Sequence, residues 1–180
     1  MDNKWILADP MPEDCRNKLD RWQSEPVLQQ LFWNRKLISE EEAMRFVRYQ
    51  ISHDADPYKL ADMTGAVERI LAALDAGQLI AIYGDYDVDG VTATLVLKQG
   101  LEAYGAKVVY YIPDRHLEGY GIHSTVLQRF ANQGVDLVIS VDCGISAFAE
   151  VQQSNELGMD FIVTDHHQIS SELPEALAII

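Results

Sequence analysis

Five short apolar runs, which alternate with helix-length segments, constrain the fold of this chain more than any other feature of the sequence. The runs lie at residues 79–83, 107–112, 136–142, 160–165 and 176–180. The segments between the first four runs, at 90–105, 123–134 and 146–158, each end near a glycine, as helices commonly do. Strands that are apolar throughout are typical of a parallel sheet covered by helices on both faces. We therefore predict a doubly wound α/β fold for residues 61–180.

Residues 1–60 precede this pattern, and we predict that they form a short helical segment that packs as a cap on a neighbouring domain. Ser39 is followed three residues later by Glu42, which is a capping-box pattern at the start of an amphipathic segment over 39–49. A further helix is predicted over 63–78, directly before the first apolar run. The N-terminal segment shows no cluster of catalytic residue types, so we expect the chemistry in the second part.

Composition limits the location and the partners of the protein. The chain has 180 residues and two cysteines far apart in sequence, which argues against a disulfide framework or a zinc ribbon. No signal peptide and no apolar stretch of membrane-spanning length occur, so we expect a cytoplasmic protein without a membrane partner. The formal net charge is -14, and residues 61–180 carry 5 Lys or Arg against 17 Asp or Glu. Bulk charge therefore does not predict nucleic-acid binding, although bound divalent metals would change the local charge.

Acidic and imidazole side chains follow four of the predicted strands. In a doubly wound sheet, ligands bind beyond the carboxyl ends of the strands. Oxygen and imidazole ligands without clustered thiols suit Mn²⁺, Mg²⁺, Fe²⁺ or Zn²⁺. Like charges this close together repel one another unless a cation lies among them, so we predict a metal site at this edge. The residues are Asp85, Asp87 and Asp89, then Asp114, Arg115 and His116, then Asp142, and finally Asp165, His166 and His167.

Single positions in this set have plainer interpretations. Asp142 could serve only as a helix N-cap, and Arg115 could be a solvated surface charge. Cys143 is best interpreted as a small packing residue. The pair His166 and His167 is harder to explain in this way, because a turn after a strand normally uses Gly, Asn or Ser.

Three motifs resemble those of the DHH phosphoesterase superfamily: "DYDVDG" from Asp85, "VDCG" from Val141 and "TDHH" from Thr164. Tyr83 stands where the pyrophosphatase and oligoribonucleotide-hydrolase relatives have histidine, and Arg115 precedes a Gly-Tyr-Gly at 119–121. These details, with "DPYKLADM" upstream, resemble the RecJ branch of single-strand-specific 5′ to 3′ exonucleases in bacterial DNA repair and recombination. Members of that branch are far longer, so the resemblance implies an N-terminal fragment whose DHH domain, residues 61–180, is incomplete at its C-terminus.

The resemblance implies an enzyme that hydrolyses phosphodiester bonds of single-stranded DNA with two Mn²⁺ or Mg²⁺ ions. Two such ions supply an activated water and neutralise the charge that builds on the phosphoryl oxygens. The implied metal ligands are Asp87, Asp89, Asp142 and His166, with Asp142 bridging the two ions. The implied catalytic residues are Asp85 and His167, as supports or proton-transfer groups, and Arg115, as a phosphate clamp.

Two other functions remain open at this stage. A DHH hydrolase of short oligonucleotides, pyrophosphate or cyclic dinucleotides would use the same metal site, although Tyr83 and the stretch 115–121 argue against it. A non-catalytic scaffold is also known in the superfamily, but the complete set of carboxylates and histidines argues against that function. The resemblance further allows a single-strand-binding protein and a helicase as partners.

Overall fold

The computed structural model of the chain describes residues 6–19, 25–48, 56–169 and 172–180. Its contacts divide the chain into two compact units, Met1–Ala55 and Asp56–Ile180. The domain boundary that the sequence predicts after residue 60 stays a prediction.

The first unit contains three short helices, α1 (Glu13–Leu19), α2 (Pro26–Asn34) and α3 (Glu40–Val47). The predicted capping box at the start of α3 is confirmed, because the Ser39 hydroxyl accepts from the Glu42 amide at 3.2 Å and the Glu42 carboxylate accepts from the Ser39 amide at 3.0 Å. Tyr49, the last residue of the segment predicted to contain this helix, lies outside the described residues. The small core of this unit is formed by Met11, Leu19, Phe32 and Ala43.

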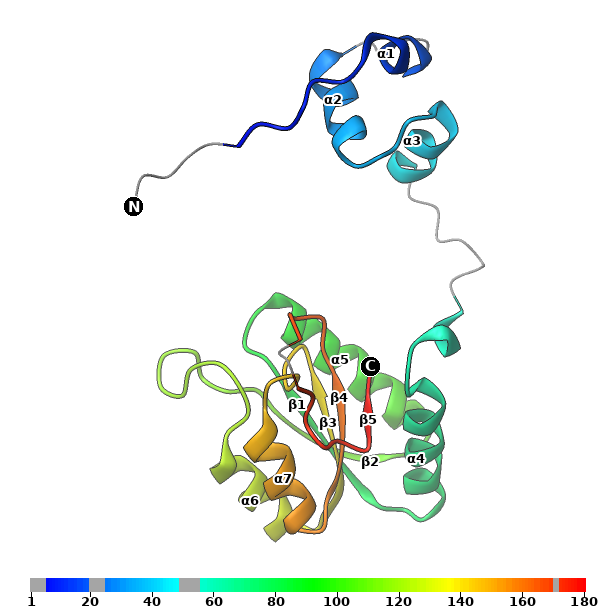
Figure 1. Cartoon of the computed structure of the whole chain (residues 1–180). Helices are drawn as coiled ribbons and strands as arrows, with labels where there is room; N and C mark the ends of the chain where they lie inside the picture. The colour runs from blue at the N-terminus through cyan, green and yellow to red at the C-terminus, as the bar shows by residue number, and fades with distance from the viewer. Residues whose placement is uncertain (1–5, 20–24, 49–55, 170–171) are drawn as a thin grey trace. The chain divides into compact units, whose positions relative to one another are not determined.

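The second unit is built on a five-stranded sheet in which every pairing is parallel, with strand order β2-β1-β3-β4-β5 (Figure 1). This confirms the predicted fold class, although β5 is shorter than the predicted run. The strands are β1 (Leu79–Gly84), β2 (Lys107–Tyr111), β3 (Val135–Val141), β4 (Asp160–Thr164) and β5 (Ala178–Ile179). The helical elements are the 3₁₀ turn η1 (Pro57–Lys59), α4 (Met63–Asp75), α5 (Val88–Ala103), α6 (Ser124–Asn132) and α7 (Phe148–Glu156).

Successive side chains of each strand enter two cores on opposite faces of the sheet. In β1, Ile80 and Ile82 belong to the core that receives Leu101 of α5, whereas Tyr83 belongs to the core that receives Phe130 of α6. Helix α4 joins α5 on the first face, and α7 joins α6 on the second (Figure 1). Burying one such large side chain stabilises the fold by about 1.5–3 kcal/mol. Because both faces are covered, the strands are apolar at consecutive positions.

The register of the central strands places three aspartates side by side at the carboxyl edge of the sheet. Gly84 of β1 pairs with Val141 of β3, and Val141 pairs with Thr164 of β4. The residues that follow these paired positions are Asp85, Asp142 and Asp165. Between β1 and β3 the winding also reverses, since the chain first moves outward to β2 and then returns to the other side of β1. A crevice opens at such a switch point, and it is where ligands bind in this class of fold.

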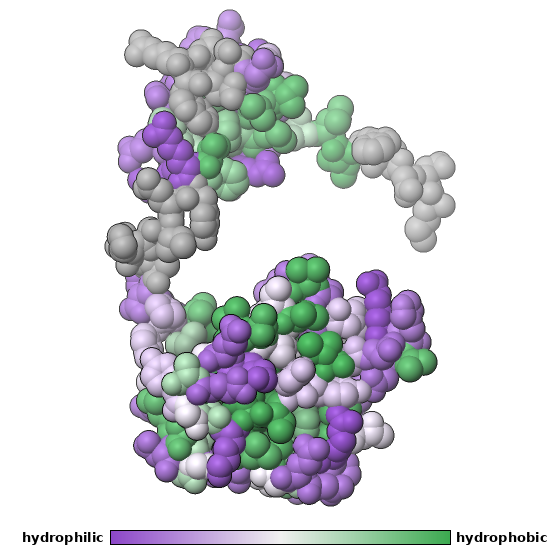
Figure 2. Space-filling view, turned by 180° about the vertical axis from the view of Figure 1, so that it is seen from behind, coloured by the Kyte–Doolittle hydropathy of each residue, from purple (hydrophilic) through white to green (hydrophobic). Residues whose placement is uncertain are grey.

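Apolar side chains also reach the surface of the second unit. In the space-filling view, hydrophobic residues lie in patches between hydrophilic ones (Figure 2). Helix α5 contributes to the exposed apolar set on the side that faces away from the sheet, with Val88, Val91, Leu95 and Val96. Within the described residues, no helix combines the length and apolar character that a membrane crossing requires.

Candidate metal centre

The loop between β1 and α5 brings the first acidic motif close to the sheet edge. A Cβ atom on Gly90 would lie 2.5–2.7 Å from the backbone of Asp85, so only glycine allows the first turn of α5 to approach the strand end this closely. Asp87 caps the helix, because its Oδ1 accepts from the amides of Asp89 at 2.9 Å and Gly90 at 3.1 Å. The "DVDG" stretch is therefore a capped helix start that holds its carboxylates over the end of β1.

Asp142 is the most unusual carboxylate in the structure. Its side chain is 6% exposed, and among the described residues no backbone amide or hydroxyl donates to either of its carboxylate oxygens; its polar neighbour is the imidazole of His166, whose Nε2 is 2.9 Å from Oδ1. The N-cap interpretation of this residue is wrong, since α7 begins only at Phe148 and its N-cap is Ala147. The backbone of Asp142 is left-handed, with φ 62°, a conformation in which Asp and Asn are enriched among residues other than glycine. Because a buried carboxylate is costly unless it is paired or coordinates a metal, and its polar neighbour is the exposed His166 imidazole, this site fits a cation.

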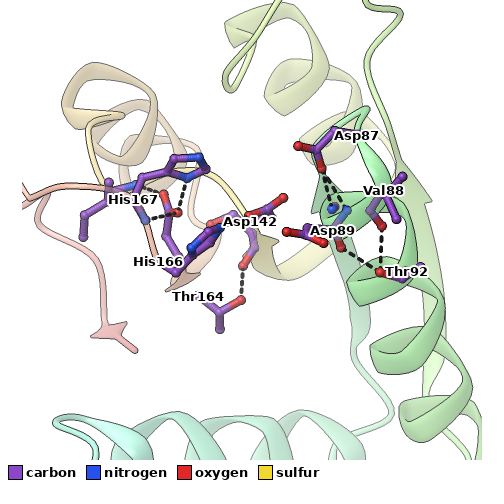
Figure 3. Close-up of polar contacts among 12 residues, drawn as sticks. Asp87, Val88, Asp89, Thr92, Asp142, Thr164, His166 and His167 are labelled. Atoms are coloured by element: carbon purple, nitrogen blue, oxygen red, sulfur yellow. Dashed lines mark hydrogen bonds and ion pairs between the residues drawn. The ribbon is translucent and has the colours of Figure 1, made fainter. Parts of the chain in front are cut away.

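Two groups of potential ligands share Asp142. One consists of Asp85, Asp87 and Asp142, and the other of Asp142, His166 and His167; within each group the ligand atoms lie within 4.8 Å of one another. His166 Nε2 is 2.9 Å from Asp142 Oδ1, and its side chain is 71% exposed. Figure 3 shows Asp87 and Asp89 on one side, His166 and His167 on the other, and Asp142 between them. The two groups therefore meet at one buried carboxylate.

The pKa values in the first group shift in opposite directions. Burial raises the pKa of Asp142, and the charge of the Asp87 carboxylate raises it further. The hydrogen bond from the Gly90 amide lowers the pKa of Asp87, so this carboxylate is ionised at neutral pH. Two carboxylates in this arrangement repel each other, and a bound cation would remove that repulsion.

Asp165 orients the second histidine. Its Oδ1 accepts from His167 Nδ1 at 2.7 Å and from the His167 amide at 3.1 Å, and its Oδ2 accepts from the Ile145 amide at 3.0 Å. Burial alone would raise the pKa of Asp165, but these hydrogen bonds lower it below its usual value. The same hydrogen bond to Asp165 raises the pKa of His167. Since ionised Asp165 only accepts, it holds a proton on Nδ1 and leaves Nε2 of His167 to interact with a ligand or substrate.

Asp85 and Asp89 take different places around this cluster. Asp85 is 3% exposed, and its buried Oδ1 has no hydrogen-bond partner among the described residues. Asp89 belongs to neither group of three, but it lines a hollow of about 490 Å³ together with Asp142 and His166. The structure thus brings Asp89 to the edge of the site and not to its centre.

Arg115 lies outside the carboxylate cluster. Its guanidinium carbon is 5.2 Å from the centre of the Tyr86 ring, a distance typical of a cation–π contact. Asp114, which was expected near the metal, instead turns into its own loop, where its Oδ1 accepts from the amides of His116 and Leu117. The loop after β2 therefore offers a cation to the site, not a further carboxylate.

Tyr86 and Tyr120 are neighbours of the site that sequence reasoning missed. The ring of Tyr120 lies 6.4 Å from that of Tyr86 and 5.7 Å from that of His167, and its hydroxyl is 3.3 Å from His167 Nδ1. Burial and the nearby carboxylates raise the pKa of Tyr120, so its hydroxyl stays protonated at neutral pH. The sequence does contain a sign of the role of Tyr120, because Tyr120 lies between Gly119 and Gly121. These glycines have φ of 81° and 101° and let the loop turn toward the sheet edge.

Comparison with known proteins places this site in context. Residues 79–180 match the domain described as "DHH family, N-terminal domain". The chain is 36% identical over 177 residues to the "Single-stranded-DNA-specific exonuclease RecJ" of Bacillus subtilis (strain 168). The matched stretch covers 98% of this chain and 22% of that relative.

Two solved structures are also similar to the chain. The crystal structure of "exonuclease RecJ bound to manganese" is 41% identical, with a TM-score of 0.59 over 63% of this chain and 29% of that chain. The crystal structure of "RecJ in complex with Mn2+" from Thermus thermophilus is 27% identical, with a TM-score of 0.69 over 97% and 24% of the respective chains. The chain spans about a quarter of the length of these proteins.

Proposed function

The chain belongs to the DHH family, and on that premise we propose that it is the metal-binding part of a RecJ-type exonuclease, which hydrolyses single-stranded DNA from the 5′ end. Family membership confirms the resemblance of the three motifs. The single observation that carries the proposal is Asp142, a buried carboxylate that receives no hydrogen bond from any described backbone amide or hydroxyl and that is shared by two groups of potential ligands. Similarity to proteins named as single-stranded-DNA-specific exonucleases, and to structures that contain manganese, supports the substrate and the metal.

The residues present fit a pair of Mn²⁺ or Mg²⁺ ions. The donor set is carboxylate oxygen and imidazole nitrogen, which suits these metals, and Asp142 is the residue common to both groups. We assign the metal ligands as Asp87, Asp89, Asp142 and His166. Asp89 is included although it belongs to neither group, because it shares a hollow with Asp142 and His166 and points toward Asp142 (Figure 3). When bound, the ions supply an activated water and neutralise charge on the phosphoryl oxygens. Asp142 would serve both ions, and Asp87 would keep its oxygen in place through its capping hydrogen bonds.

Three further residues act around the phosphate in this proposal. Asp85 is 3% exposed and belongs to one group with Asp87 and Asp142, so its carboxylate would support the ligands from the buried side. His167 carries its Nδ1 proton toward Asp165, so Nε2 is the atom at which it takes or gives a proton. Arg115, which rests on the ring of Tyr86, binds two phosphate oxygens with its fork of N–H groups.

The test of this proposal is the choice of substrate in the presence of Mn²⁺. We expect nucleotides to be released from 5′-labelled single-stranded DNA and a blunt duplex to stay intact. Asp142→Asn should abolish release, whereas Asp136→Asn, at the opposite end of β3, should leave it unchanged. Rapid turnover of pyrophosphate or a cyclic dinucleotide, with long single strands untouched, would contradict the proposal and establish a small-substrate hydrolase. If none of these substrates is turned over, either by this chain alone or by a fusion of this chain to the remaining part of the Bacillus subtilis relative, the protein is a scaffold.

We expect turnover by this chain alone to be slow. Single strands are held by basic grooves and stacking aromatics, whereas residues 61–180 carry 12 more acidic than basic side chains. A fusion of this chain to the remaining part of the Bacillus subtilis relative should digest single strands markedly faster, and equal rates would contradict this reasoning. A single-strand-binding protein and a helicase as partners, and a cytoplasmic location, stay predictions.

A further inference from the structure

A second hollow adjoins the metal centre, and the proposed hydrolysis gives it no role. It has a volume of about 480 Å³ and lies between the loop after β2 and the start of α7. Asp165 lines both this hollow and the one that contains Asp142, and His167 lies at its edge. Its walls include Tyr120, Ile122, Ile145, Ala147 and Glu150. We call this hollow the tyrosine pocket.

The side chains of the tyrosine pocket favour an uncharged occupant over an anionic one. Neither Lys nor Arg is among the described residues that line it, and two carboxylates, Asp165 and Glu150, are. A phosphate group would be repelled there. The other walls include the ring of Tyr120, the apolar side chains of Ile122, Ile145 and Ala147, and the imidazole of His167, which is hydrogen-bonded to Asp165. A flat, uncharged group with N–H donors at its edge would fit such walls, and a nucleobase has these properties.

The Tyr120 wall is anchored from below by a buried tyrosine. The hydroxyl of Tyr83 donates to the Gly121 carbonyl at 3.2 Å and accepts from the His123 amide at 3.1 Å. Tyr83 is fully buried, and its ring makes an edge contact with Phe130 at 6.5 Å. The segment that carries Tyr120 is therefore fixed by two hydrogen bonds from the sheet core. A wall fixed in advance spares the ligand the entropic cost of ordering it.

The opposite wall meets this segment closely. A Cβ atom on Gly144, whose φ is 111°, would lie 3.3 Å from Cδ1 of Ile122 and 2.6 Å from the Ser140 hydroxyl. Glycine at this position therefore lets the two walls meet at the floor of the pocket. Small apolar pockets with a few polar groups at the rim are typical ligand sites.

We propose that the tyrosine pocket binds the nucleobase of the nucleotide whose phosphate lies at the metal centre, with Tyr120 as the stacking surface. The inference rests on the proposed function and deepens it, because it assigns the base-binding subsite of the same reaction. His167, at the border of the two hollows, lies between the phosphate and its base. Stacking on an aromatic ring tolerates every base, so this subsite selects unpaired bases without reading sequence.

The test uses methyl NMR spectra of the whole 180-residue chain with Mg²⁺ and non-hydrolysable trinucleotides. Ile122 and Ile145 report on the tyrosine pocket, and Ile180, which lines the hollow with Asp142, reports on the metal centre. We expect both sets of methyl signals to shift with a complete trinucleotide. Three abasic trinucleotides, each without the base at one position, are then compared. One of the three should no longer shift the Ile122 and Ile145 signals but should still shift the Ile180 signal.

Variants extend the test. Tyr120→Ala should weaken binding of the complete trinucleotide by about 5- to 150-fold, the range that base stacking supplies, and should leave binding of the abasic trinucleotide unchanged. Tyr104→Ala, at the far end of α5 and 82% exposed, is the matched control and should change neither.

Each outcome bears on a different claim. If Ile180 shifts while Ile122 and Ile145 do not, or if all abasic trinucleotides behave like the complete one, the tyrosine pocket is not a base site and the proposed function stands. If no signal shifts with any trinucleotide, the proposed function and this inference are both overturned. The comparison of complete and abasic ligands needs no variant, so it does not depend on the folding of Tyr120→Ala.

Discussion

Replacing Asp142 by Asn tests whether this buried carboxylate exists to hold metal. The amide has the shape of the carboxylate, and Asn tolerates the left-handed backbone at this position as Asp does. Without metal, we expect Asp142→Asn to raise the melting temperature. The raised pKa of Asp142 means that the fold disfavours its charged form, and the amide removes both the buried charge and the repulsion by Asp87.

With metal, the order of the two proteins should reverse. A ligand that binds only the folded state at 100 times its dissociation constant adds about 2.7 kcal/mol of stability. The second unit spans Asp56–Ile180. For a unit of that size, about 2.1 cal/mol/K per residue gives an unfolding entropy of about 0.26 kcal/mol/K, so the gain corresponds to about 10 °C. Asp142→Asn should lose most of this shift, because the residue belongs to both groups of ligands.

The assay is thermal unfolding followed by circular dichroism, in a chelator and in a series of Mn²⁺ concentrations. Asp136→Asn is the control, because Asp136 lies at the opposite end of β3, where its carboxylate accepts from the Leu79 amide at 3.0 Å, which an Asn oxygen can also do. This control should keep the full Mn²⁺ shift. If Mn²⁺ leaves the melting temperature of the parent unchanged, or if Asp142→Asn responds as the parent does, the metal assignment is wrong.

Three further predictions follow from the contacts around the site. Tyr83→Phe should destabilise the fold by about 1–3 kcal/mol in urea unfolding, because it leaves the Gly121 carbonyl and the His123 amide without their partner. The control Tyr111→Phe should destabilise it less, since Glu118, the partner of Tyr111, is exposed to water. Gly90→Ala should lower the free energy of unfolding by about 1–3 kcal/mol, because the added methyl group meets the backbone of Asp85. In the control Gly100→Ala, in the same helix, the methyl group meets no atom within 4 Å, so the free energy of unfolding should rise by about 0.5–1 kcal/mol in the same assay. The hydrogen bond from Tyr111 lowers the pKa of Glu118 in the folded protein. The stability that this hydrogen bond contributes is therefore fully present at pH values above the ordinary pKa of Glu, and it is lost as the pH falls through the lowered pKa of the folded state. An NMR titration of Tyr111→Phe should show the pKa of Glu118 moving upward, and an unchanged value would contradict this account.

The order of the elements and the edge that carries the chemistry were predictable from the sequence alone. Apolar runs at 79–83 and 160–165 predict strands covered on both faces, and the glycines after the intervening segments predict where helices end. Because parallel strands all end at one edge, Asp85, Asp142 and His166 had to lie at the same side of the sheet whatever the strand order. This prediction required only local periodicity and the direction of the strands, which are properties of the chain itself.

The centre of the site was decided only by the tertiary structure. From the sequence, only the family resemblance set Asp142 apart from Asp87 and Asp89, as the bridging ligand. The strand register supplies the physical reason, because it puts Asp142 in the middle, where no helix starts and no described backbone amide donates to its carboxylate. The contact of Tyr120 with His167 joins residues 47 positions apart and depends on how the loop after β2 is anchored. Burial, register and loop anchoring are set by contacts between segments that are distant in sequence, so the sequence could name candidate ligands but could not arrange them.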